Sequence, residues 1–196
     1  MKPRKCYNDL LKQRRDKEIS ILIGPRQVGK TTILKKLCET WDGLFLDLDI
    51  FSNYEKVSTY EGFLNTLKLS GYHEEQKEMF FVFLYEFQRY ADLTLIMKNI
   101  YDHLDNIKIY ASGSSSLTIK NSIQESLAGR KHITHIYPLS FEEFLLFKER
   151  HEFVEMLKRL KDLKTKEYFK LIPEILSLFE EFLIFGGYPK VVLADI

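Results

Sequence analysis

One short segment constrains this chain more than any other, because it matches a motif of known physical role at every fixed position. Residues 24–31, Gly-Pro-Arg-Gln-Val-Gly-Lys-Thr, have the pattern GxxxxGK[ST]. The segment follows an apolar run at residues 19–23 and opens a stretch with apolar residues at helical spacing, which is the strand–loop–helix setting that the motif requires. In that setting, backbone N–H groups and a helix N-terminus face the β- and γ-phosphates of a nucleoside triphosphate. The sequence therefore predicts a phosphate-binding loop.

The residue types in this segment point to particular contacts with a nucleotide. The Lys30 side chain would bring a positive charge to the phosphates, and the Thr31 hydroxyl would bind Mg²⁺. Arg26 leaves two alternatives open, a contact with the nucleotide or one with a partner. The residues predicted to bind ATP are Gly24, Pro25, Arg26, Gln27, Val28, Gly29, Lys30, Thr31 and Thr32.

Short apolar runs alternate with helical patterns up to about residue 138, which is typical of a parallel sheet covered by helices. Strands are predicted at residues 19–23, 44–48, 79–84, 107–111 and 133–137. Helical patterns without further strands follow at residues 141–150, 153–163 and 174–185. The fold class is therefore α/β, with a helical segment after the sheet.

Three candidate capping boxes predict where helices begin, because a Ser side chain can bond the backbone three residues on while a Glu bonds back. The three pairs are Ser52 with Glu55, Ser58 with Glu61, and Ser140 with Glu143.

Hydrolysis of a nucleotide also needs carboxylates at the end of a neighbouring strand. The third apolar run leads into Glu86, which is placed to act as general base on the attacking water. Tyr85 stands where an ordinary Walker B strand has aspartate, and its phenol offers no carboxylate to Mg²⁺, which prefers carboxylates, phosphate oxygens and water. Asp47 and Asp49, after the second strand, either compensate for this loss or serve a loop or a helix cap.

Two later features add candidate catalytic residues. Ser112 and Ser114 follow the fourth strand and suit a polar sensor between the Walker B carboxylate and the γ-phosphate, with a simple polar turn as the alternative. Arg130 could supply positive charge to a transferring phosphoryl group in a neighbouring subunit. The alternative for Arg130 is an ordinary surface arginine ahead of a strand.

Composition narrows the functional classes. The 196 residues include 29 Lys and Arg against 28 Asp and Glu, for a net charge of +1, which argues against a protein built mainly to coat nucleic acid or an acidic membrane. No segment has 18 uncharged apolar residues in a row, so no membrane span is predicted. The two cysteines lie far apart without a CxxC or a nearby His pair, so neither a disulfide framework nor a zinc site is indicated. A reduced, cytoplasmic location is predicted.

Seven segments, in order along the chain, carry a resemblance to one family: GPRQVGKTT, LFLDLD, LYEFQ, IKIYASGSSSL, ESLAGR, YPLSFEEFL and FGGYPKVVL. From about Lys17 to Leu193, the chain resembles the archaeal and bacterial AAA-type ATPases of the AAA_14 family, which usually carry a DUF4143 C-terminal domain. Family members usually have Asp-Glu where this chain has Tyr85 and Glu86. That departure puts Mg²⁺-dependent hydrolysis in question and leaves nucleotide binding intact.

The resemblance implies a P-loop NTPase core of the ASCE type with strand order 5-1-4-3-2. It implies nucleotide and Mg²⁺ roles for Lys30 and Thr31, a catalytic glutamate at Glu86, and a sensor at Ser112 or Ser114. It also places Arg130 in the family's LAGR element, which favours a role as an arginine finger.

Together these inferences predict three parts. They are a helical lead-in at residues 1–17, a P-loop ATPase core at 18–138, and a helical lid or adaptor at 139–196 that continues into a missing C-terminal domain. The predicted function is hydrolysis of ATP to ADP and phosphate with Mg²⁺, bound by Thr31 and Asp47, in a homo-oligomer or with an unknown protein partner.

Two alternatives stay open at this point. The first is a nucleotide-binding switch or assembly module with little turnover, which Tyr85 favours. The second is a small-molecule P-loop kinase, which is weaker because the segment after the fourth strand is Ser-rich and lacks an Arg-rich lid.

Overall fold

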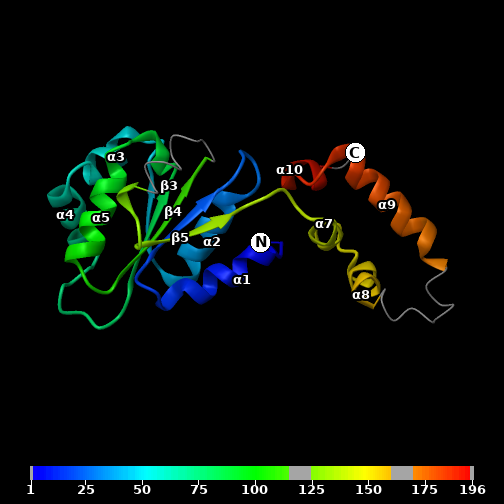
Figure 1. Cartoon of the computed structure of the whole chain (residues 1–196), viewed down its shortest axis with the longest axis horizontal. Helices are drawn as coiled ribbons and strands as arrows, with labels where there is room; N and C mark the ends of the chain where they lie inside the picture. The colour runs from blue at the N-terminus through cyan, green and yellow to red at the C-terminus, as the bar shows by residue number, and fades with distance from the viewer. Residues whose placement is uncertain (1, 115–124, 160–169, 195–196) are drawn as a thin grey trace. The chain divides into compact units, whose positions relative to one another are not determined.

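The computed structural model describes residues 2–114, 125–159 and 170–194. Contacts within the chain divide it into two units: Cys6–Ile136, and a second unit that holds the described residues before Cys6 and after Ile136. All described strands belong to the first unit, and the described elements of the second are helices (Figure 1).

The first unit alternates strands and helices. Its strands are β1 (Ile19–Ile23), β2 (Leu44–Asp47), β3 (Phe80–Tyr85), β4 (Ile107–Gly113) and β5 (Lys131–His135). Its helices are α1 (Lys5–Lys12), α2 (Lys30–Trp41), α3 (Phe51–Val57), α4 (Tyr60–Leu69) and α5 (Leu93–His103), with 3-10 turns η1 (Gln13–Arg15) and η2 (Phe87–Arg89).

The strands form one parallel sheet in the order β2-β3-β4-β1-β5, which confirms the predicted fold class and strand order. β1 is buried along its whole length because it pairs with β4 on one side and β5 on the other. A central strand covered on both faces needs a near-continuous apolar run, and Ile19–Ile23 supplies it except at Ser20, whose Oγ donates to Gln13 Oε1 at 2.7 Å. All five strands end at the same edge of the sheet, where the loop after β1 also lies.

Helices cover both faces of this sheet, and β3 shows how the sequence divides between them. Val82 and Leu84 pack with residues of α3, α4 and α5 in one core. Phe81 and Phe83 point to the other face and pack with α1 and α2. There the Trp41 ring stacks on Phe81 with centroids 4.8 Å apart, fixing the end of α2 against the sheet. The alternation follows from the two-residue period of a strand.

Two of the three predicted capping boxes are wrong. α3 has Ile50 as its N-cap, and no side chain caps it. At α4 the cap is Thr59, whose hydroxyl accepts from the Gly62 N–H at 3.0 Å. Ser58 instead donates its hydroxyl to the Glu55 carbonyl, closing the preceding helix. β5 also begins two residues earlier than predicted.

The second unit is a small helical assembly. It contains α7 (Phe141–Phe147), α8 (His151–Arg159), α9 (Ile172–Phe185) and α10 (Pro189–Val192). The predicted capping box of Ser140 and Glu143 is present at α7. The helices share one core that includes Phe144, Phe153 and Ile175. Large apolar side chains of α9 remain exposed: Leu176, Phe179, Leu183, Ile184 and Phe185.

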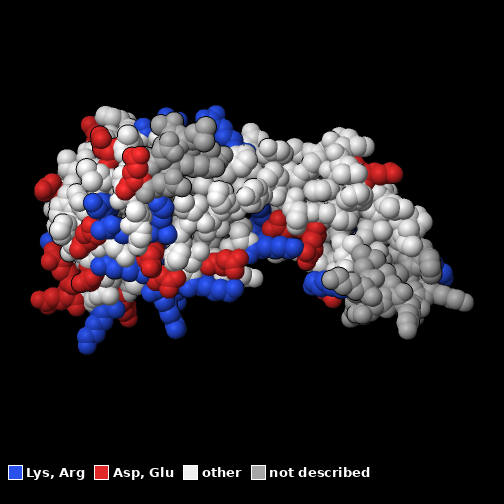
Figure 2. Space-filling model, in the orientation of Figure 1, with Lys and Arg blue, Asp and Glu red and all other residues white. Residues whose placement is uncertain are grey.

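The surface carries charges of both signs. On the face drawn in Figure 2, Lys and Arg are interspersed with Asp and Glu over the described residues of the first unit. Over the described parts of the chain, no helix is both long enough and apolar enough to cross a membrane.

Candidate nucleotide-binding site

The loop between β1 and α2 has a glycine at each end, and the geometry requires both. A Cβ on Gly24 would lie 2.1 Å from the carbonyl oxygen of Ile136, so the backbone after β5 leaves no room for a side chain. Gly29 has φ 97°, in the left-handed region, and its carbonyl accepts the Ile33 N–H of α2 at 3.0 Å. The loop thus turns sharply into a helix whose N-terminus faces the edge where the strands end.

The side chains of the loop divide between surface and core. Val28 is buried in the core shared with α2 and anchors the loop from below. Thr31 is partly exposed in the first turn of α2, as a hydroxyl must be to reach a ligand. Four of the predicted binding residues are exposed: Pro25, Arg26, Gln27 and Thr32.

Lys30 lies beneath this loop and is only 5% exposed. Its Nζ donates to the carbonyl oxygens of Gly24 at 3.0 Å and Pro25 at 2.7 Å. Burial lowers the pKa of Lys30, Glu86 acts in the opposite direction, and Arg26 lowers it further. An ammonium held under a loop of backbone amides is the arrangement that binds phosphate groups.

The residue after β3 brings a carboxylate to this lysine. Glu86 has φ 58°, a left-handed conformation rare outside glycine, and it ends the strand at once. Its charge raises the pKa of Lys30, because Glu86 lies at the same edge of the sheet as the loop. Gln88 Nε2 donates a hydrogen bond to Glu86 Oε2. A lysine, a carboxylate and a phosphate loop therefore meet at one edge of the sheet.

The carboxylates predicted to compensate for Tyr85 are engaged locally. Asp47 pairs in register with Tyr85, and its Oδ1 accepts the Asp49 N–H at 3.0 Å. Asp49 forms an ion pair with Arg89. Within the described ranges, no cluster of three or more His, Cys, Asp or Glu side chains could hold a metal ion. The residues fit Mg²⁺ only with nucleotide phosphates as the other ligands, which is how Mg²⁺ usually binds.

The two predicted sensor serines lie in different environments. Ser112 is fully buried in β4, in register with Tyr85 on one side and Leu22 on the other. Its Oγ has no hydrogen-bond partner among the described residues, which is unusual for a buried hydroxyl and indicates a polar contact still to be made. Ser114 is partly exposed just beyond the strand.

Arg130 is not part of this cluster. It directly precedes β5, and its carbonyl accepts the N–H of Ile19 at the start of β1, so it lies at the opposite edge of the sheet from the loop. Its guanidinium forms two hydrogen bonds to Asp102 of α5, at 2.7 and 3.1 Å. This pairing raises the pKa of Arg130 and lowers that of Asp102.

The sequence predicts no role for Gln88, although it belongs to the LYEFQ segment. Two residues after Glu86, Gln88 would lie on the opposite side of a helix. The 3-10 turn η2 returns it to Glu86, and no residue pattern in the sequence signals this turn.

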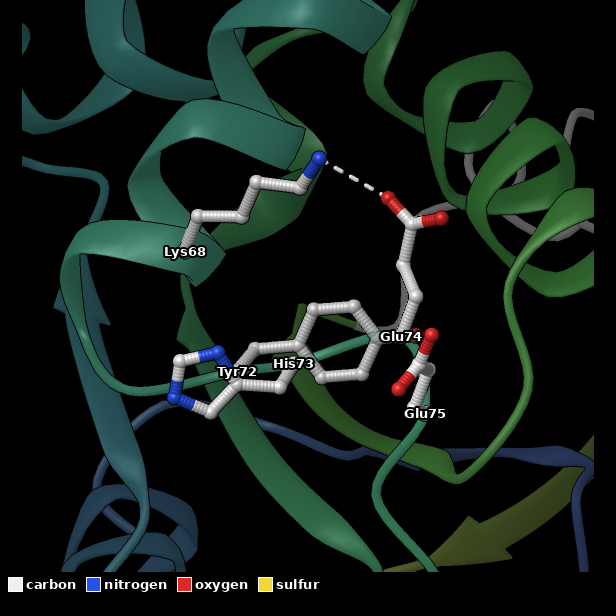
Figure 3. A pocket seen from close by; sticks show the side chains of 5 residues that line it. All are labelled: Lys68, Tyr72, His73, Glu74 and Glu75. Carbon is white, nitrogen blue, oxygen red and sulfur yellow. Dashed lines mark ion pairs between the residues drawn. The ribbon is translucent and has the colours of Figure 1, made fainter.

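A surface hollow of about 500 Å³ lies elsewhere, between the end of α4 and the loop before β3 (Figure 3). Lys68 and Glu74 form an ion pair of 2.8 Å across its upper side. The other lining side chains are Tyr72, His73 and Glu75. Tyr72 donates to the carbonyl of Asp105, which precedes β4, so the hollow lies at the edge where strands begin. It is therefore separate from the phosphate loop.

Comparisons with known proteins agree with this geometry. The family model AAA_14, described as an AAA domain, matches residues 16–145. The chain is 29% identical over 182 residues to an uncharacterized protein of Methanocaldococcus jannaschii, covering 91% of this chain and 37% of that protein. It is 25% identical over 205 residues to one of Haemophilus influenzae, covering 98% and 45%. The chain thus spans about two fifths of the length of these curated relatives.

Among solved structures, the fold is similar to that of a Walker-type ATPase of Pyrococcus abyssi. The TM-score is 0.59 at 16% identity, and the match covers 98% of this chain and 66% of that one. At this identity the similarity is one of fold. The family match is broader evidence, because it includes the phosphate loop and all five strands of the sheet. The chain therefore belongs to the AAA_14 family of AAA domains.

Proposed function

We propose that this chain binds ATP at the loop between β1 and α2 and hydrolyses it to ADP and phosphate with Mg²⁺. The observation that carries the proposal is buried Lys30, whose Nζ donates to two carbonyls of that loop, with Glu86 at the same edge of the sheet. A cation for the phosphates and a general base for water are the two charged groups that the reaction needs from the protein.

The side chains suggest how the reaction would proceed. Lys30 Nζ, which donates to two loop carbonyls, would turn its donors to the β- and γ-phosphates. A water oxygen would form a bond to the γ-phosphorus while the bond to the ADP oxygen breaks, and the water proton would pass to Glu86. Ser112 Oγ, buried without a described partner, would donate to the same reacting region.

The Thr31 hydroxyl would hold Mg²⁺ together with phosphate oxygens, and Asp47, at the end of β2, would add a carboxylate. Bound in this way, the ion would neutralise charge on the phosphates. Tyr85 leaves this shell one carboxylate short of the usual arrangement.

A second candidate function is a nucleotide-binding switch or assembly module with little turnover. The observation that favours it is the engagement of both aspartates, Asp47 with the Asp49 N–H and Asp49 with Arg89. Each carboxylate already has a local partner, with which a metal ion would have to share it.

The test measures ATP affinity by calorimetry and phosphate release for the native chain and for Lys30→Ala, Glu86→Gln and Tyr85→Asp. We expect micromolar-class binding for all but Lys30→Ala, which should lose roughly 10-fold or more because a charge-assisted hydrogen bond is removed. Glu86→Gln should slow turnover by about 100-fold or more. Tyr85→Asp should turn over faster than the native chain.

Matched controls are Lys36→Ala, on the same helix but ion-paired with Glu39, and Glu78→Gln, before the start of β3. Both should behave like the native chain. Unchanged ATP binding in Lys30→Ala would overturn the site itself. Brisk native turnover that Glu86→Gln leaves intact would overturn the general base. Tight binding with turnover only in Tyr85→Asp would establish the switch or assembly module.

A further inference from the structure

We propose that Gln88 is a positioning residue that fixes the orientation of the Glu86 carboxylate. Gln88 Nε2 donates to Glu86 Oε2, which leaves Oε1 as the oxygen free to accept the water proton. The proposal rests on the proposed hydrolysis, because a fixed general base matters only if there is a proton to take.

The turn that brings Gln88 to Glu86 is anchored on both sides. Phe87, directly before Gln88, is buried in the core. Arg89, directly after it, pairs with Asp49 beyond β2. The Tyr90 ring stacks on Tyr54 of α3 with centroids 3.4 Å apart and planes within 4°. A left-handed glutamate is conformationally unfavourable, and these contacts hold the turn in spite of it.

The neighbouring strand leaves space for the Gln88 amide. A Cβ on Gly113 of β4 would lie 2.7 Å from Gln88 Oε1 and 3.0 Å from the Phe87 ring. The absence of a side chain at Gly113 therefore lets the amide lie flat against β4. Gln88 Oε1 is buried there and has no partner in the part of the chain that the structure describes. The amide orientation is thus set by its one hydrogen bond to Glu86.

A carboxylate that can rotate spends part of its time turned from the reacting water, and misplacement by about 1 Å can cost roughly 100-fold in rate. Glu86 raises the pKa of Lys30. In the complex with nucleotide, Lys30 would be drawn toward the phosphates instead. The amide of Gln88 is then the contact that keeps Glu86 in place during the reaction.

The experiment compares kcat, ATP affinity and the affinity for ADP–aluminium fluoride relative to ADP in the native chain and in Gln88→Ala. We expect kcat to fall roughly 10- to 100-fold with ATP affinity unchanged. The preference for the transition-state analogue should fall in parallel, since it measures the same geometry without turnover. A second variant, Gln88→Glu, introduces a negative charge, and its control is Gln76→Glu in the loop before β3.

The pH dependence of kcat in Gln88→Glu distinguishes positioning of Glu86 from a purely structural role, which would leave the shape of the pH profile unchanged. At neutral pH the introduced carboxylate repels Glu86, whereas at lower pH a proton shared between them replaces the amide N–H. Its kcat relative to the native chain should therefore recover as pH falls. A profile parallel to the native one would contradict the proposal.

Gly113→Ala tests the same geometry from the other strand, because the added methyl group would displace the amide. It should resemble Gln88→Ala, and the double variant should be no slower than Gln88→Ala alone. Native kcat in Gln88→Ala beside a slow Glu86→Gln would overturn the positioning role and leave the proposed function standing. A native chain that binds ADP but shows neither turnover nor preference for the analogue would overturn both.

Discussion

At the scale of single residues, the most unusual side chain outside the nucleotide site is Lys108. It lies in the middle of the sheet on β4, has no exposed surface, and donates to the carbonyl of Glu18. Its ammonium lies 5.2 Å from the centre of the Tyr110 ring. Burial lowers the pKa of Lys108 from 10.5 to about 8, against the opposing charges of Asp16 and Glu18. A shift of this size corresponds to about 3 kcal/mol that charged Lys108 subtracts from stability at neutral pH.

This shift predicts how stability depends on pH. Between pH 8 and 10.5 the unfolded chain binds a proton at Lys108 that the folded chain has released, so unfolding free energy rises with pH by up to about 1.4 kcal/mol per unit. Lys108→Met lacks this contribution. Denaturant titrations should therefore show native stability rising relative to Lys108→Met across this window. The same comparison with Lys77→Met, in an exposed loop, should show no such trend, and a constant difference for Lys108→Met would contradict the buried charge.

The residues of the site differ in how far the sequence predicted them. Lys30 and Glu86 follow from motifs whose spacing places one at the start of the helix after β1 and the other directly after β3, and the structure brings both to the edge of the sheet where the strands end. Asp47 was uncertain because a carboxylate after a strand serves a turn as readily as a metal, and it accepts a backbone N–H in such a turn. Gln88 depends on the backbone angle of Glu86, which no side-chain pattern encodes.

At the scale of elements, the first turn of α7 is tied to the beginning of the chain. Glu143 is buried, and its Oε1 accepts from Arg4 Nε at 3.1 Å and from the Lys5 N–H at 2.9 Å, while Oε2 accepts from the Ser140 N–H at 3.1 Å. Arg4 also donates to the carbonyl of Tyr137 at 2.8 Å. One carboxylate therefore caps a helix and holds an N-terminal segment against it.

Glu143→Gln should loosen both segments. The amide has one accepting oxygen where the carboxylate has two, and buried Arg4 would lose its countercharge, which costs roughly 3–5 kcal/mol. Amide hydrogen exchange in α7 should accelerate by about 100-fold or more, with protection in β1 and β4 unchanged. Glu142→Gln, whose partner Lys5 is exposed, should change exchange little. Equal effects of the two substitutions would argue against a buried ion pair at Glu143.

The predicted bounds of the elements are correct where burial is continuous along the element and wrong where it is not. β1, buried along its length, has the bounds that the sequence predicted. β5 has an exposed edge and exposed residues on both faces, so its pairing with β1 decides where it starts. Ser58 and Thr59 both offer a capping hydroxyl, and the choice between them depends on the packing of α3 against α4.

At the scale of the whole molecule, Arg130 and the phosphate loop lie at opposite edges of one sheet. An arginine that serves a nucleotide from there must serve that of a second copy. We expect turnover per chain to rise with protein concentration and Arg130→Ala to lower it, with Arg15→Ala, in the turn before β1, as control. Phosphate release measured over a dilution series checks this. If the rate is independent of concentration, or is unchanged in Arg130→Ala, then Arg130 serves only to pair with Asp102.

The order of the strands also has a consequence for synthesis. β1 carries the phosphate loop early in the chain, yet its two neighbours, β4 and β5, are made much later. While the ribosome is still translating, Ile19–Ile23 is an apolar strand with both edges open, which invites mispairing with other chains. We expect the proposed nucleotide site to form only after His135 has emerged and both edges are closed. ATP would then bind selectively to nascent chains that have already completed the sheet.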